Sequence, residues 1–200
     1  RRYYELFKIK RMINFRSMVL RMGTVTPAQE ILEFQHSCPT VRDLLRLRYH
    51  QVDIGRVALS NVLSRHKFSR FDLANSETLK EICDVLAQSQ RNVLAVEQLV
   101  EEQRPELALL LEKGLSPMAE LFGVCVAKGI PVVQYVGSQN MNEYVLKRFN
   151  LQNRHQHPFS LDETTWNRVK AMPWTPEQET ELLEEFADSY RKGLWFNRKF

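Results

Sequence analysis

The sequence lacks the features that mark secreted and membrane proteins. Its longest apolar runs fall far short of the roughly 20 residues that a membrane-spanning helix needs, and no secretory signal pattern occurs. Its three cysteines, Cys38, Cys83 and Cys125, are widely separated and lie in apolar helical surroundings. An odd, unclustered set argues against a disulfide framework or a zinc site and indicates reduced thiols. We therefore expect a soluble, cytoplasmic protein.

Several chemical motifs are also missing. The sequence contains no G-x-G-x-x-G fingerprint, no Walker loop, no nucleophile elbow, no paired-cysteine motif and no D-x-D-like metal motif. Each absence removes a class of enzyme. We expect neither a metal nor a cofactor bound to this chain.

Length and charge set further bounds. A chain of 200 residues suffices for one domain, whereas two full Rossmann-like halves need considerably more. Because the chain opens on Arg1-Arg2 without an initiator Met, we expect a fragment. The formal net charge is +4, and residues 1–22 hold seven Lys and Arg against one acidic residue, Glu5. This segment predicts an amphipathic helix that either packs on the core with a basic outer side or lies on anionic lipid.

Helical periodicity dominates the first half of the chain. Thr26-Pro-Ala-Gln29 has the spacing of a capping box and predicts a helix over 27–36. Residues 41–63 have a helical pattern in which Gly55 marks a point of close packing, since glycine otherwise weakens a helix. The longest periodic segment, 76–103, predicts a helix that covers a sheet.

Residues 104–138 predict one βαβ unit. The segments 107–111 and 132–136 are short apolar runs, which are typical of parallel strands buried on both faces. Between them, Ser116 suits the cap of a helix, and Gly129 suits the left-handed residue that ends it.

The last third of the chain is expected to continue in helices. We predict a short helix over 140–149 and a polar loop over 151–158. The capping boxes Ser160-Leu-Asp-Glu163 and Thr175-Pro-Glu-Gln178 predict helices over 160–172 and 175–192. The expected fold is a helix-rich α/β single domain or fragment with a Rossmann-like parallel sheet and additional helices at both ends. Residues 1–103 are expected to be mainly helical, 104–138 to form the βαβ unit, and 139–200 to be a helical continuation.

The carboxyl ends of the two predicted strands are the candidate binding site, because ligands of open α/β sheets lie there. A glycine after the first strand lets a ligand approach the backbone, and free amides at the start of the next helix attract hydroxyl or anionic groups. We expect the backbone to turn sharply at Gly114. Neutral hydrogen-bonding residues after the second strand suit carbohydrate hydroxyls. The substrate-binding candidates are Lys113, Gly114, Ser116, Gln134, Gly137, Ser138 and Asn140.

Two residues are candidate catalytic groups. Glu120 can accept a proton from a sugar hydroxyl, although the sequence favours a surface carboxylate over this role. His155 belongs to a concentrated titratable group, Arg154-His-Gln-His157, and a neutral imidazole can act as a base. The cationic side chains of Lys147, Arg148 and Arg154 can bind a phosphate group. Alternate spacing of the two histidines argues against shared metal ligation.

A series of short sequence words occurs in a recognisable order. They are Val52–Ser60, Arg104–Glu112, Gly114–Glu120, Lys128–Val136, Lys147–Phe149, His155–Leu161 and Trp166. Over residues 40–196 this order resembles the glycosyltransferase-like proteins of bacterial capsule and surface-polysaccharide biosynthesis, which have a GT-B fold.

That resemblance implies the acceptor-side, amino-terminal domain of a glycosyltransferase. A nucleotide-sugar donor would be held mainly by a missing carboxyl-terminal domain, so the fragment alone would be inactive. The implied partners are a carbohydrate acceptor, the missing domain and, peripherally, an anionic membrane at its inner face; no nucleic acid is expected. The alternative function is a non-catalytic binding module that uses the basic amino-terminal helix on anionic lipid or nucleic acid.

Overall fold

The computed structural model describes residues 11–37, 39–66, 71–138 and 143–191. These residues form a helix-rich α/β protein with one small mixed sheet, which confirms the coarse fold class. The described elements are α2 (Phe15–Arg21), α3 (Gln29–His36), α4 (Val41–Arg46), α5 (Ile54–His66), α6 (Ser76–Gln103), β1 (Ala108–Leu110), α7 (Met118–Ala127), β2 (Val132–Gly137), β3 (Tyr144–Phe149), α8 (Glu163–Lys170) and α9 (Pro176–Arg191).

The sheet contains the predicted parallel pair and one unpredicted strand. β1 pairs with β2 in parallel, with Ala108 beside Val132, which confirms both strands of the βαβ unit. β3 pairs with β2 antiparallel, so the strand order is β1-β2-β3. The predicted helix over 140–149 is therefore wrong from Tyr144 onward, and residues 139–142 lie outside the described residues.

Alternation along β3 shows why it is a strand. Phe149 is buried opposite Val132, and its ring meets Phe122 of α7 edge-on, with 5.5 Å between centroids. Tyr144 and Leu146, which occupy alternate positions, are each 67% exposed. Pairing with the free edge of β2 satisfies backbone groups of both strands, and this tertiary contact outweighs the local helical preference of Leu, Lys and Arg.

In the part of the chain that the structure describes, the outer face of β1 is uncovered and that of β2 is only partly buried, which corrects the prediction of strands buried on both faces. In β1, Leu110 is buried whereas Leu109 is 59% exposed, and the flanking Leu107 and Leu111 are also exposed. β1 is an edge strand whose inner face packs on α7.

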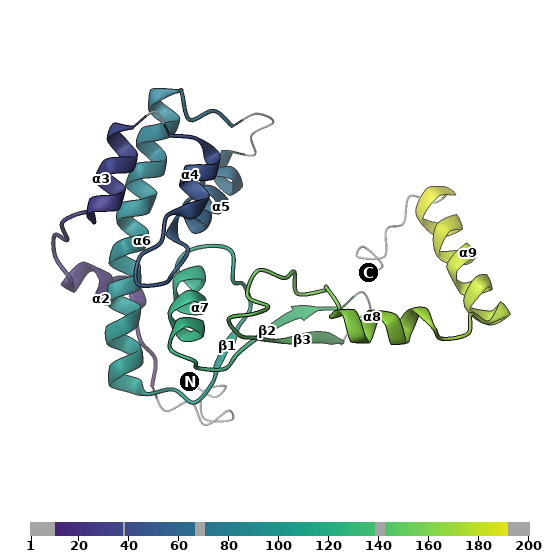
Figure 1. Cartoon of the computed structure of the whole chain (residues 1–200). Coiled ribbons are helices and arrows are strands. Elements are labelled where there is room, and N and C mark those ends of the chain that lie inside the picture. The colour runs from purple at the N-terminus through teal and green to yellow at the C-terminus, as the bar shows by residue number, and fades with distance from the viewer. Residues whose placement is uncertain (1–10, 38, 67–70, 139–142, 192–200) are drawn as a thin grey trace.

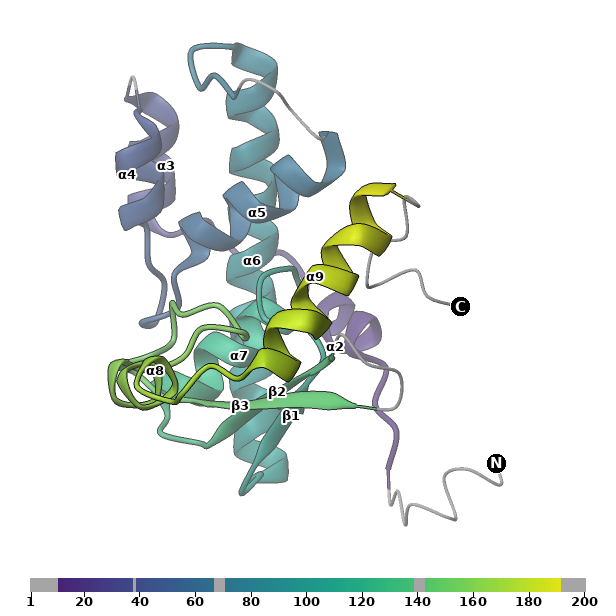
Figure 2. The same cartoon turned by 90° about the vertical axis from the view of Figure 1, so that its right-hand side faces the viewer.

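α6 organises the helical layer. It spans Ser76 to Gln103, as the sequence predicts, and Asn75 caps it by accepting hydrogen bonds from two amides of the first turn. α5 and α7 pack along α6, and α7 contacts β1 and β2 (Figures 1 and 2). The sheet is therefore covered by α7, which corrects the prediction that α6 covers it. Gly129 ends α7 with a φ of 72°, as expected.

Gly55 is the predicted point of close packing. Residues 41–63 form two helices, α4 and α5, instead of one. The segment between them turns back, so that the start of α5 lies beside the end of α4. A side-chain carbon at Gly55 would lie 1.7 Å from the carbonyl oxygen of Leu44. Only glycine permits this approach of backbone to backbone.

The basic amino-terminal segment is described only from residue 11. α2 has seven residues; Met18 is buried in it and Phe15 packs against the core, while Arg16 and Arg21 are exposed. Over α2, this arrangement agrees with a core-packed helix that has a basic outer side. Within the described ranges, no helix combines the length and the apolar composition that crossing a membrane requires.

α3 begins without the predicted capping box. Its first residue is Gln29, and no side chain caps it. Instead, Gln90 of α6 accepts a hydrogen bond from the amide of Ala28 and donates one to the carbonyl of Thr26, each at 3.0 Å. The contact of Gln90 with the segment before α3 thus takes the place of the predicted capping box.

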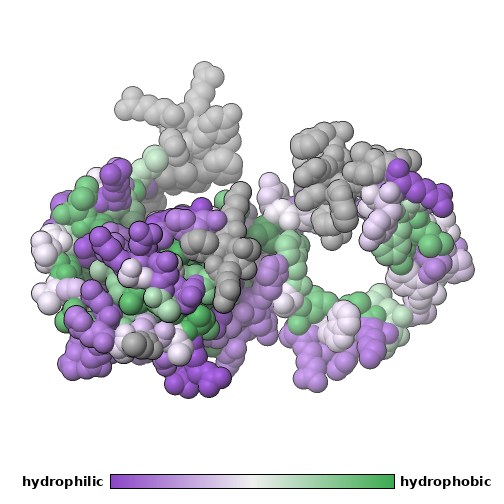
Figure 3. All heavy atoms as spheres, turned by 90° about the horizontal axis from the view of Figure 1, so that it is seen from above, coloured by the Kyte–Doolittle hydropathy of each residue, from purple (hydrophilic) through white to green (hydrophobic). Residues whose placement is uncertain are grey.

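α8 and α9 form an arm that extends away from the other elements (Figure 1). Asp162 caps α8, in place of the predicted Ser160, whereas Thr175 and Gln178 form the predicted box at α9. Ser189 is the only residue of these two helices that is buried. Hydrophobic surface is visible on the arm in Figure 3, and Trp166, Trp174 and Phe186 are among its exposed residues.

Candidate functional site

A cleft of about 410 Å³ lies at the carboxyl ends of β1 and β2, where the sequence predicts the site. It is lined by the start of α5, by the loop from β1 together with α7, and by the loop over residues 154–159. This volume falls within the range of small-molecule sites. The polar lining residues include Asp53, Arg56, Ser60, Glu112, Lys113, Gln134, Arg154, His155 and His157.

Asp53 is the centre of an ion-pair network in one wall of the cleft. Its Oδ1 lies 2.8 Å from Nε of Arg48. Its Oδ2 lies 3.5 Å from Nη2 of Arg154 and 3.5 Å from Nε2 of His155. The network joins the start of α5 to the loop over 154–159, two segments about a hundred residues apart in sequence.

A tight hairpin immediately before Asp53 fixes its position. Tyr49 and Val52 exchange two backbone hydrogen bonds of 2.9 Å. His50 and Gln51 between them have left-handed φ angles of 47° and 68°, a conformation that costs free energy in residues other than glycine. The hairpin therefore needs contacts that hold it.

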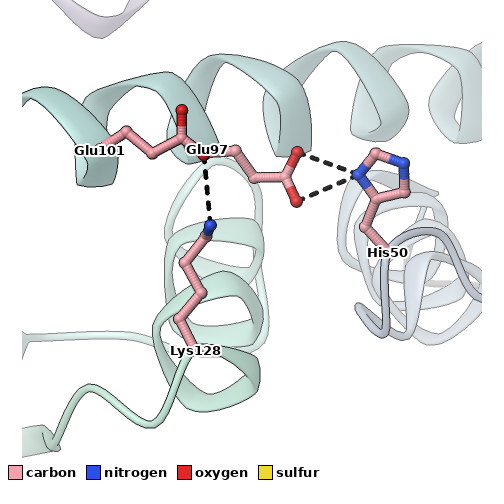
Figure 4. Close-up of polar contacts among 4 residues, drawn as sticks. All are labelled: His50, Glu97, Glu101 and Lys128. Carbon is pink, nitrogen blue, oxygen red and sulfur yellow. Dashed lines mark hydrogen bonds and ion pairs between the residues drawn. The ribbon is translucent and has the colours of Figure 1, made fainter.

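Figure 4 shows one such contact. Nδ1 of His50 lies 3.0 and 3.1 Å from the two carboxyl oxygens of Glu97 on α6. One turn further along α6, Glu101 pairs with Lys128, beyond the end of α7, at 3.4 Å. Both sides of the cleft are thus fastened to the same long helix.

Two lysines hold the loop over 154–159. Lys113 Nζ donates to the carbonyl oxygen of Arg154 at 2.7 Å and lies 4.5 Å from the ring centre of Phe149. Lys147 Nζ donates to the carbonyl oxygens of His157 and Ser160. Lys113 lines the cleft as predicted, but both ammonium groups are committed to positioning the loop.

Lys113 should be an unusually reactive lysine. Burial, with the nearby cations Lys147 and Arg56, lowers its pKa to about 8, although Glu112 opposes the shift. Only the neutral amine attacks an electrophile, so acylation of Lys113 should rise through about pH 8. Mass spectrometry of peptides after brief acetylation across pH 6–11 would measure this. A midpoint near 10.4, the value of a solvated lysine, would contradict the prediction.

His155 carries a neutral imidazole. Arg154 Nε donates to its Nε2 at 3.1 Å, which assigns the ring proton to Nδ1. Burial lowers the pKa of His155; Asp53 raises it, and the cations Arg56, Arg154 and Lys113 lower it. The ring is therefore neutral at pH 7, and a proton received at Nε2 would lie 3.5 Å from Asp53.

Gln134 lines the cleft from β2 and is 2% exposed. Its Nε2 donates to the carbonyl oxygen of Leu111 at 3.1 Å. Because a carbonyl only accepts, this bond fixes the orientation of the amide. Its Oε1 has no hydrogen-bond partner among the described residues, which leaves a buried acceptor for a donor to meet.

Glu112 folds back onto the backbone of the loop that follows β1. Its Oε1 accepts hydrogen bonds from the backbone amides of Lys113 at 2.7 Å and Gly114 at 2.6 Å. Gly114 lines the cleft, but its φ lies outside the left-handed region. The backbone bends at Gly114, as expected, although this φ does not by itself require glycine.

Glu120 lies behind the cleft. It is fully buried, which rules out the interpretation as a surface carboxylate, and it does not line the cleft. Its Oε1 accepts hydrogen bonds from Ser116 Oγ at 2.7 Å and Asn92 Nδ2 at 3.2 Å. Ser116 also accepts from Asn61 at 3.3 Å and does not cap α7, which starts at Met118. We assign both Glu120 and Ser116 to a network that joins α5, α6 and α7.

The remaining predicted residues lie at the carboxyl end of β2, which runs past the end of β1 and beyond the last cleft-lining residue of β2, Val136. Gly137 and Ser138 are not among the cleft-lining residues, and Ser138 Oγ donates to Glu143 at 3.3 Å. Asn140 lies outside the described residues. The structure thus brings Lys113, Gly114, Gln134 and His155 together and places Ser116, Glu120, Gly137 and Ser138 elsewhere.

Sequence reasoning missed Asp53 and Arg56 as site residues. Both line the cleft: Asp53 immediately precedes α5, and Arg56 lies in its first turn. Their signal was available: two charged residues stand among the apolar residues of Val52–Ala58.

Neither of the two described cysteines, Cys83 and Cys125, lines the cleft. Cys83 and Cys125 are buried free thiols, and burial raises the pKa of Cys125 to about 11. Cys38 lies outside the described residues. Within those residues, no group of three or more His, Cys, Asp and Glu side chains is arranged to hold a metal ion.

Comparisons with protein-family models, curated proteins and solved structures give no match to this chain.

Proposed function

We propose that the chain is the acceptor-side domain of a glycosyltransferase that builds a bacterial surface polysaccharide. The observation that carries the proposal is the position of the cleft: it lies beyond the carboxyl ends of the parallel pair β1 and β2, where α/β sheets bind ligands. The antiparallel edge strand β3 is compatible with this class of sheet, since largely parallel sheets often carry one. In this proposal the sheet is the Rossmann-like half of a GT-B architecture.

The chain would supply only part of the enzyme. A nucleotide-sugar donor would bind to a separate carboxyl-terminal domain, and the acceptor sugar would occupy the cleft described above. Transfer would take place on the cytoplasmic side, with peripheral contact to an anionic membrane.

His155 is the base in this proposal. As the acceptor hydroxyl oxygen bonds to the anomeric carbon, the bond from that carbon to the donor phosphate breaks, and the hydroxyl proton passes to Nε2 of His155. The resulting imidazolium would be stabilised by Asp53, whose Oδ2 is 3.5 Å away. Because Nε2 accepts the Nε–H of Arg154 in this structure, Arg154 would have to release that hydrogen bond before Nε2 could take the hydroxyl proton.

Sugar binding to the chain should be weak and local. Titration with neutral and charged monosaccharides, followed by amide and side-chain NMR shifts, should perturb Gly114, Gln134 and His155 first. A half-cleft buries only part of a ligand, so millimolar dissociation constants are expected. Shifts confined to α2 or to the acidic helix α9 would contradict the proposed function.

A further inference from the structure

Positive charge is in excess in the cleft. Three cations, Arg56, Lys113 and Arg154, line it against two carboxylates, Asp53 and Glu112. Both carboxylates are already engaged. Asp53 pairs with Arg48, Arg154 and His155, and Glu112 accepts two backbone amides. An anion entering the cleft would therefore meet a positive field.

Arg56 is the cation left to receive such an anion. Lys113 donates to the carbonyl of Arg154, and Arg154 itself contacts Asp53 and His155. Among the described residues, the exposed guanidinium of Arg56 has no hydrogen-bond or ion-pair partner. A free guanidinium in a cleft suits a phosphate or a carboxylate, because its planar fork binds either one through two parallel hydrogen bonds.

Gln134 offers the cleft a hydrogen-bond acceptor in place of a cation. Its buried Oε1 accepts no hydrogen bond from the described residues, and the bond from Nε2 to Leu111 prevents the amide from turning over. This oxygen can accept a hydrogen bond from a donor such as a hydroxyl group. The cleft thus offers a cation, Arg56, that can bind an anion, and an oxygen, Gln134 Oε1, that can accept a hydrogen bond from a hydroxyl group.

We propose that the ligand of this cleft is a sugar that carries an anionic group, with the anion bound by Arg56 and a ring hydroxyl donating to Gln134. The inference rests on the proposed function, to which it adds the class of acceptor. A sugar phosphate and a uronic acid share this chemistry. The bound charge would also offset the cations that surround His155, so binding should raise the pKa of His155 from its lowered value.

The test compares four probes on the chain by NMR titration: glucose, glucuronate, glucose 1-phosphate and inorganic phosphate. At least one charged sugar should bind about tenfold more tightly than glucose, since a charge-assisted hydrogen bond is stronger than one between neutral groups. The tighter of the two charged sugars identifies carboxylate or phosphate as the anionic group. Arg56→Gln should remove the advantage of the charged sugar, whereas the matched control Arg42→Gln, on exposed α4 surface, should retain it.

The outcomes separate the two proposals. Equal affinity for glucose and both charged sugars, or an unchanged preference in Arg56→Gln, would overturn the anionic acceptor and leave the sugar-binding function standing. If inorganic phosphate binds as tightly as glucose 1-phosphate and Gln134→Leu changes nothing, the cleft is an anion site only and both proposals fail. Absence of binding by all four probes would also overturn both. A His155 pKa that rises with the charged sugar and not with glucose would support the inference independently.

Discussion

Replacing Gly55 with alanine should destabilise the protein by about 3 kcal/mol, the upper part of the range for overpacked cores. The added carbon would lie 1.7 Å from the carbonyl oxygen of Leu44 and 3.2 Å from Cβ of Leu47. Backbone cannot rotate out of the way as a side chain can, so α4 must separate from α5. The midpoint of urea unfolding, followed by circular dichroism, would measure the loss.

The direction of the stability change in Gly55→Ala distinguishes a closely packed glycine from an ordinary helical one. In an exposed helix, glycine to alanine stabilises by about 1 kcal/mol, because alanine is the better helix former. The control is Gly137→Ala, where an added carbon meets nothing within 4 Å and φ is outside the left-handed region. That variant should stay within about 0.5 kcal/mol of the wild type. Equal midpoints for the two variants would show that α4 and α5 can move apart freely.

Gly55 also illustrates what sequence can supply. A glycine inside a helical pattern is costly unless a close contact needs it, and this local rule led to a correct three-dimensional statement. The same holds for β1 and β2, whose apolar runs were bounded by turn residues. Such features are encoded within a few neighbouring residues.

β3 shows where local reasoning fails. The segment after Gly137 contains Leu, Lys and Arg, which favour helix, yet it pairs with β2 along the full length of both strands. The partner strand decides its conformation. Likewise, the exposure of Leu109 depends on whether another layer covers the sheet, and nothing in the run of leucines encodes that.

The candidate site was predicted in part for the same reason. Lys113, Gly114 and Gln134 were correctly predicted to line the cleft, because the topology of a parallel strand pair fixes the end at which a ligand binds. Asp53 and Arg56 reach the cleft only because the hairpin over 49–52 and its contact with Glu97 return the chain toward α7. A contact between residues about a hundred positions apart, such as Asp53 with Arg154, leaves no periodic pattern in the sequence from which it could be predicted.

Glu120 provides the second large expected effect. Glu120→Ala should lower the free energy of unfolding by about 3 kcal/mol, because it leaves Asn92 Nδ2 and the Ser116 hydroxyl without their buried acceptor and opens a cavity. Glu120→Gln retains one acceptor oxygen in the same place and should cost only about 1 kcal/mol. Urea unfolding of both variants against the wild type would measure the difference.

The same pair of variants decides between a structural and a catalytic Glu120. Because Glu120 is fully buried and does not line the cleft, Glu120→Gln should bind sugars with the affinity of the wild type, and under the proposed function it should retain transfer activity. His155→Gln should behave in the opposite way: stability should change little, since the ring is about half exposed, while transfer should fall by roughly 10²–10⁴-fold, the usual contribution of a general base. If Glu120→Gln instead abolished transfer at unchanged stability and His155→Gln remained active, the catalytic assignment would move from His155 to Glu120, and the cleft would have to open further than this structure shows.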